Sequence, residues 1–116
     1  MKINKAIYIY AYKNSNLNIL TTPISNYLLN TNYTLSDLDY YITTYNKDKS
    51  INKSDLNKLL YNIKRINELI LIENIYPPKE ELNEIIALCQ KYNTKVITIS
   101  KNGVIKWVTI LRLLYI

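Results

Sequence analysis

The stretch Ala6-Ile7-Tyr8-Ile9-Tyr10-Ala11-Tyr12 decides the fold class of this chain. Its apolar first half is typical of a buried strand, and the polar loop Lys13-Asn14-Ser15-Asn16 follows it. In open α/β domains, ligands and chemistry gather where the parallel strands end. We therefore expect a first strand over residues 5–12, with two tyrosines and no obvious catalytic residue at its functional end.

Apolar runs and helical stripes alternate along the rest of the chain. We expect further strands over 38–45, 68–72 and 95–100. We expect helices beginning at Pro23, at Ser54, after Pro77-Pro78 and after Gly103. This β-α-β-α-β-α-β-α order predicts a single α/β domain, 1–116, with a mostly parallel sheet of four to five strands and helices on both faces.

The composition permits a nucleic-acid partner and does not require one. The 116 residues are 48% apolar, which is enough for one domain with its own core. The net charge of +6 suits an anionic partner such as DNA. Asn, Ile, Lys and Tyr dominate the sequence, and all four have A/T-rich codons. A low-GC genome, plausibly that of a bacterium or its mobile elements, is therefore an equal explanation for the lysines.

Several classes of site are excluded by the residues that are missing. The chain has no histidine and one cysteine, Cys89, so neither a common zinc site nor an intramolecular disulfide is expected. Cys89 lies in a helical apolar stripe and is expected to be a core residue. Gly103 is the only glycine, so no glycine loop can hold phosphate. We expect no cofactor, no small-molecule substrate, no membrane span, and a soluble cytoplasmic protein.

Ile7-Tyr8-Ile9-Tyr10-Ala11-Tyr12 resembles the opening strand of the catalytic domain of serine recombinases, the resolvase/invertase family. That strand has the pattern apolar-Tyr-apolar-Arg-apolar-Ser, in which the arginine holds phosphate and the serine is the nucleophile. Tyr10 falls at the arginine position and Tyr12 at the serine position. The resemblance implies a resolvase-like fold that has lost two working residues.

Later segments resemble the same family and lack its arginines. Residues 52–60 match a loop followed by a Leu-x-x-Leu-Leu helix, with Lys53 at the position of an arginine. The segment 73–78, which contains Asn74, lies where the family carries Leu-Asp-Arg-x-x-Arg. Neither Arg65 nor Arg112 matches a catalytic position. The resemblance therefore implies a non-catalytic domain with degenerate positions at Tyr10, Tyr12, Lys53 and Asn74.

Tyrosine attacks phosphate in other recombinases, so Tyr12 remains an alternative nucleophile at this stage. Such a site still needs a cationic clamp and usually a histidine, which the chain lacks. Aromatic packing at the end of the strand is the simpler interpretation of Tyr10 and Tyr12.

Binding surfaces are more plausible than a catalytic site. The lysines of two loops and one helix are expected to form a basic rim that contacts nucleic acid. The alternative is that these lysines are simply solvated surface residues. The lysines are Lys13, Lys47, Lys49, Lys53, Lys58 and Lys64. Apolar residues of the expected last helix suggest a homodimer or a recombinase partner; they are Trp107, Ile110, Leu111 and Leu114.

These features support two functional hypotheses. The first is a non-enzymatic, DNA-associated protein that regulates recombination by dimerising or by binding a partner. The second is a protein-interaction or structural module with no nucleic-acid role.

Overall fold

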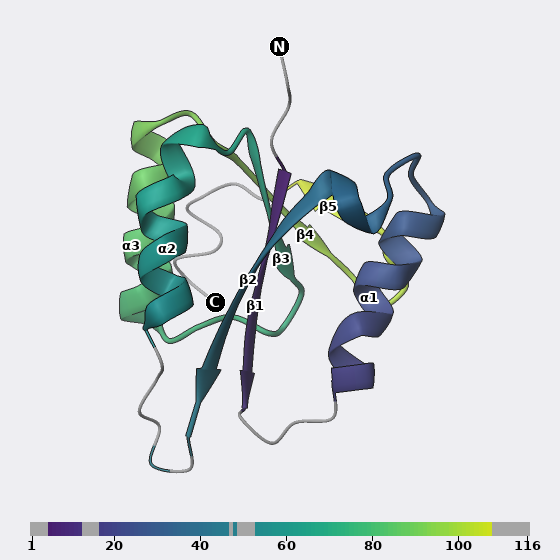
Figure 1. The fold of residues 1–116 in the computed structure, drawn as a ribbon, viewed down its shortest axis with the longest axis horizontal. Coiled ribbons are helices and arrows are strands. Elements are labelled where there is room, and N and C mark those ends of the chain that lie inside the picture. Colours follow the sequence, from purple (N-terminus) through teal and green to yellow (C-terminus); the bar gives the residue numbers. More distant parts are fainter. Residues whose placement is uncertain (1–4, 13–16, 47, 49–52, 108–116) are drawn as a thin grey trace.

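Five strands form one sheet in the order β2-β1-β3-β4-β5 (Figure 1). The computed structural model describes residues 5–12, 17–46, 48 and 53–107. The strands are β1 (Lys5–Tyr12), β2 (Leu38–Tyr45), β3 (Glu68–Ile72), β4 (Lys95–Ile99) and β5 (Ile105–Trp107). The first four are parallel and β5 runs antiparallel to β4. The expected α/β class with a mostly parallel sheet is confirmed.

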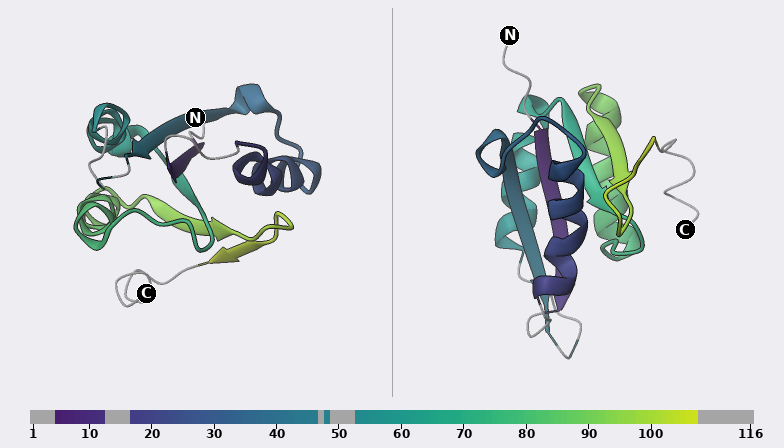
Figure 2. Two further views of the ribbon diagram at one scale, coloured as in Figure 1. Left: turned by 90° about the horizontal axis from the view of Figure 1, so that it is seen from below. Right: turned by 90° about the vertical axis from the view of Figure 1, so that its right-hand side faces the viewer.

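Helices cover both faces of this sheet, as expected. The α-helices are α1 (Leu17–Leu29), α2 (Ser54–Asn62) and α3 (Lys79–Lys91), and the 3₁₀ turns are η1 (Leu35–Asp37) and η2 (Ile63–Arg65). In the right-hand view of Figure 2, α1 lies in front of the sheet and α2 and α3 lie behind it. The sheet is therefore the middle of three layers, which explains why its central strands are apolar on both faces.

The alternation of side chains along β1 divides the core in two. Ala6 and Tyr8 face α2 and α3, where they join Leu59 and Ile85 in one buried cluster. Ile7 and Ile9 face α1 and join a second cluster with Tyr27 and Ile97. Strand β1 is thus buried on both faces of the sheet, which is the pattern predicted from its continuous apolar run. Cys89 is also fully buried, as expected, and burial raises the pKa of its thiol to about 12.

Helix α1 begins earlier than the sequence interpretation placed it. Pro23 is not the first helical residue, because the helix starts at Leu17 and Pro23 lies inside it. An internal proline lacks one backbone hydrogen bond and costs about 3 kcal/mol in a regular helix. Pro23 is buried, and Ile24 packs in the core cluster between α1 and the sheet, which contributes stability against that cost.

The segment after Gly103 is a strand and not the start of a helix. Ile105–Trp107 pairs antiparallel with Ile97–Ile99, so the expected helix over 104–116 is wrong for its first residues. A tight turn reverses the chain, with the Gly103 N–H donating to the Ser100 carbonyl at 2.9 Å. Gly103 has φ 77°, a left-handed conformation that glycine adopts without strain. The remaining residues of that expected helix, 108–116, lie outside the described part of the chain.

Candidate nucleic-acid interface

The carboxyl ends of β1 and β2 carry a pair of stacked tyrosines. Tyr10 and Tyr45 have ring centroids 5.0 Å apart and planes 17° apart. The parallel register places Tyr10 beside Thr43, so Tyr10 reaches diagonally across to Tyr45 on the same face of the sheet. Tyr10 also packs against the core cluster beneath α2 and α3. Tyr10, which the sequence resemblance aligns with an arginine, is therefore a packing residue in this structure.

Buried hydroxyl groups lie on the same face, one residue pair below this stack. Burial raises the pKa of the Tyr8 phenol to about 12, although the nearby Thr43 hydroxyl opposes the rise. The two hydroxyls are close but not aligned, and neither makes a hydrogen bond of good geometry within the described part of the chain. Burial also raises the pKa of Tyr10. Both phenols therefore stay protonated at neutral pH, which makes them weak nucleophiles.

Lys53 and Asn74, two other positions that the sequence resemblance singles out, lie near the same edge of the sheet. Lys53 is exposed and directly precedes α2. Asn74 is exposed in the turn after β3 with φ 67°, a conformation that asparagine tolerates better than most residues. Tyr12 ends β1, and its side chain is outside the described residues.

Three of the six expected lysines can be placed, and two of these three lie on the helical segment that follows the loop, as expected. Lys13, Lys47 and Lys49 lie outside the described residues. Lys53, Lys58 and Lys64 are all exposed along α2 and η2. Because α2 runs back from the carboxyl edge of the sheet towards its amino edge, these lysines follow the length of the helix, about 16 Å at 1.5 Å per residue.

The outer face of this helix carries positive charge and no negative charge among its described side chains. We call it the α2 stripe and define it as the exposed residues between 53 and 65, namely Lys53, Asn57, Lys58, Tyr61, Lys64 and Arg65. Tyr61 is 66% exposed, and the Lys64 ammonium lies 5.1 Å from the centroid of its ring. The acidic residue of α2, Asp55, faces the β2 edge instead, where its Oδ2 accepts the Ile42 N–H at 2.9 Å.

Sequence reasoning did not include Tyr61 and Arg65 in the binding surface. Their signal was present, because residues 57, 58, 61, 64 and 65 recur at helical spacing on the side opposite the leucine stripe. The structure adds them to one continuous surface that combines cations with an exposed aromatic ring. Such a surface can contact a phosphate backbone and offers a ring for stacking.

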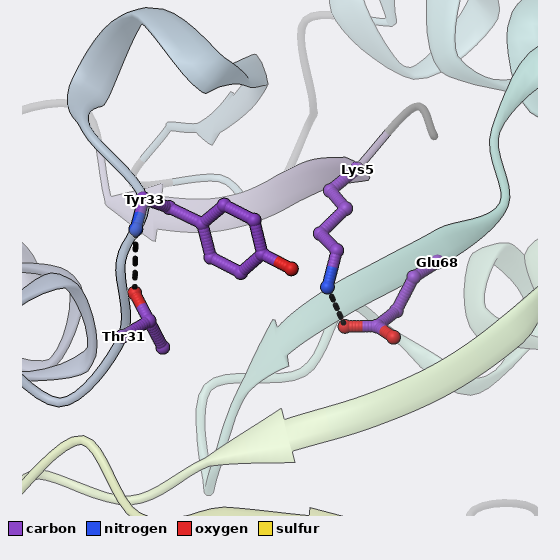
Figure 3. Close-up of polar contacts among 4 residues, drawn as sticks. All are labelled: Lys5, Thr31, Tyr33 and Glu68. Atoms are coloured by element: carbon purple, nitrogen blue, oxygen red, sulfur yellow. Dashed lines mark hydrogen bonds and ion pairs between the residues drawn. The ribbon is translucent and has the colours of Figure 1, made fainter. Parts of the chain in front are cut away.

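The amino end of the sheet holds a different charged group. Lys5 Nζ lies 3.4 Å from Glu68 Oε1 and 4.4 Å from the centroid of the Tyr33 ring. Figure 3 shows Lys5 between these two partners, and the Tyr33 N–H donating to Thr31 Oγ1. Burial lowers the pKa of Lys5, but Tyr33 and Glu68 more than offset this, so the net pKa is raised. Lys5 therefore stabilises the fold through these two contacts and is not part of the α2 stripe.

The expected dimer surface is mostly outside the described residues. Ile110, Leu111 and Leu114 lie there entirely, and only the backbone of Trp107 is placed, at the end of β5. Within the described residues, Val104, directly before β5, and Ile105, the first residue of β5, are exposed at 55% and 41%.

Among the described residues, no group of three or more His, Cys, Asp or Glu side chains could hold a metal ion. The helices of that part of the chain are too short or too polar to cross a membrane.

In comparisons with protein-family models, curated proteins and solved structures, no match to this chain was found.

Proposed function

We propose that this protein is a non-catalytic, recombinase-like domain that associates with DNA through the α2 stripe. The observation that carries the proposal is the uninterrupted positive charge of that stripe, four cations around an exposed tyrosine with no acidic side chain among them. Surfaces of this kind bind the sugar-phosphate backbone by releasing its condensed counterions. The net charge of +6 favours the same class of partner.

The recombinase part of the proposal rests on the sequence pattern of β1 and on the α/β architecture. The mostly parallel sheet with helices on both faces is the architecture that the resemblance implies. A packed Tyr10 and an exposed Lys53 support the loss of catalysis, because phosphate cleavage needs several fixed bidentate donors. A domain of this kind would act on recombination by occupying DNA or by pairing with an active recombinase.

The test is DNA binding by matched charge variants. We expect Lys58→Gln/Lys64→Gln to weaken binding of a labelled DNA roughly tenfold at low salt, because two phosphate contacts are lost. The control Lys91→Gln/Lys101→Gln removes the same charge from exposed lysines outside the stripe. Lys91 and Lys64 both lie in the last turn of a helical segment, so the effects on helix stability are comparable. Equal losses in the two variants, or no DNA affinity in the unmodified protein, would contradict the proposal.

A second candidate function, a protein-interaction module, is favoured by the exposed apolar residues at the start of β5. Val104 precedes and Ile105 begins this edge strand, whose outer backbone groups have no partner strand in the described sheet. This candidate predicts a stable oligomer whose mass is indifferent to DNA, and Ile105→Lys would dissociate it. A monomer at all concentrations in sedimentation equilibrium would count against this candidate.

A further inference from the structure

A pocket of about 340 Å³ opens at the end of the α2 stripe, between the first half of β2 and the end of α2. Its lining residues are Asp39, Tyr40, Tyr41, Asn62, Arg65 and Ile66. The volume is at the lower end of the range for small-molecule sites, about 300–1,000 Å³. It therefore suits a single flat group of nucleobase size better than an extended ligand.

We propose that this pocket receives an unpaired nucleobase, so that the protein prefers single-stranded nucleic acid over duplex. The inference rests on the proposed function, because the α2 stripe would hold the backbone of the same strand. Arg65 connects the two, since it belongs both to the stripe and to the wall of the pocket. A stacked strand advances about 3.4 Å per nucleotide. The stripe is therefore long enough to guide several nucleotides towards the pocket.

The polar groups of the wall match the edge of a base. The Asn62 amide supplies a donor and an acceptor together, so it can pair with the Watson–Crick edge of an unpaired base. The Asp39 carboxylate can accept from the exocyclic amine of cytosine or adenine. Burial raises the pKa of Tyr41, and the Asn62 side chain partly opposes this, so the amide already lies beside the phenol. The Asn62 amide and the Tyr41 phenol therefore lie together in the wall of the pocket.

The outer edge of β2, which has no partner strand in the described sheet, adds backbone groups at the same place. The Ile42 N–H donates to Asp55, which lies outside the sheet, so the backbone groups of Ile42 point away from β1. Residues two apart on a strand point their backbone groups the same way, so the N–H and C=O of Tyr40 also face outward. A donor and an acceptor on one residue can pair with the hydrogen-bonding edge of a base. That edge is exposed only when the base is unpaired, because in a duplex it faces the opposite strand.

The experiment compares three labelled probes of one length: a single strand, the same strand with abasic sugars in place of all nucleotides, and the matching duplex. We expect the unmodified protein to bind the intact single strand roughly tenfold more tightly than either of the others, as loss of a bound base would produce. The variants Asn62→Leu and Asp39→Ala should bring the intact strand to the affinity of the abasic strand. The abasic affinity should not fall in either variant, because the α2 stripe is intact, and Asp39→Ala should raise it slightly by removing a negative charge.

The control Asn83→Leu makes the Asn62→Leu exchange at an exposed site on α3 and should leave all three affinities unchanged. Unfolding curves of each variant show whether the fold is retained. If Asn62→Leu does not fold, Asp39→Ala still tests the pocket, because it changes only an exposed side chain. Equal affinity for duplex and single strand, or for abasic and intact strands, would overturn the pocket proposal while leaving the stripe proposal standing. Failure to bind any probe would overturn both.

Discussion

Replacing Gly103 with alanine tests how the hairpin between β4 and β5 is joined to the rest of the fold. Gly103 is buried against the last turns of α1. A methyl group at this position would overlap the backbone nitrogen of Tyr27 and the carbonyl carbon of Asn26, and would lie 2.8 Å from the Asn26 oxygen. The turn is also tied to the helix by the Asn26 amide, whose Nδ2 donates to the Lys101 carbonyl at 3.0 Å.

The expected loss of stability has two parts. Alanine at φ 77° costs about 1–2 kcal/mol, because its Cβ disfavours the left-handed conformation. Pressing a methyl group into helix backbone costs about 1–3 kcal/mol more, since backbone cannot rotate away as a flexible side chain would. Together Gly103→Ala should lower the free energy of unfolding by about 2–5 kcal/mol, a large fraction of the roughly 5–15 kcal/mol typical of a domain.

Urea unfolding followed by far-ultraviolet circular dichroism measures this loss. The control is Asn102→Ala, one residue earlier, where the side chain is exposed and the change should stay within about 0.5 kcal/mol. A Gly103→Ala variant within about 0.5 kcal/mol of the unmodified protein would refute the reasoning. It would show that the turn leaves room for a methyl group beside α1.

Two other substitutions test the edges of the sheet. Lys5→Met should cost about 1–2 kcal/mol at pH 7, because Glu68 loses its partner and the Tyr33 ring loses the cation above it. Since the folded pKa of Lys5 is raised, this stabilisation is complete below pH 10.5 and is lost as the pH rises through the folded value. Unfolding at several pH values should therefore show a constant difference from about pH 6 to about pH 10, and a difference that grew with pH over this range would contradict this assignment. Asp55→Ala should destabilise by about 0.5–1.5 kcal/mol, because the hydrogen bond to the Ile42 N–H is lost. The variant should also self-associate more, because the β2 edge is uncovered at this point. Light scattering that shows no added association at high concentration would argue against the second effect.

The sequence predicted the parallel part of the sheet well because each of its strands carries a strong local signal. The bounds 5–12, 38–45 and 68–72 match β1, β2 and β3 as observed. These segments are rich in isoleucine and tyrosine and are bounded by polar turns, so propensity, pattern and burial agree. Four parallel strands then leave few topologies, because crossovers are right-handed.

The two errors arose where a strong local signal was outweighed or missed. Pro23 predicted the start of a helix, but the apolar residues Leu17, Leu20 and Ile24 continue one helical face across it. At the C-terminal end, Asn102-Gly103 between two apolar segments is a hairpin signal. The helical spacing from Val104 onward outweighed it in the sequence interpretation.

The candidate site was only partly predictable because it depends on a helix surface and a pocket. Lysines 53, 58 and 64 were identified, but placing them in one stripe with Tyr61 and Arg65 required the exposed face of α2. The pocket brings Asp39 to Arg65, residues on elements far apart in the sequence. No local pattern encodes that proximity, since it follows from the packing of η2 beside the first half of β2.

The salt dependence of DNA affinity tests the central claim most directly. Each lysine that neutralises a phosphate contributes about −0.7 to −0.9 to the slope of log affinity against log salt. We predict a clearly negative slope for the unmodified protein, made shallower by about 1.5 in Lys58→Gln/Lys64→Gln and unchanged in Lys91→Gln/Lys101→Gln. A slope near zero, or the same reduction in both variants, would contradict the assignment of DNA binding to the α2 stripe.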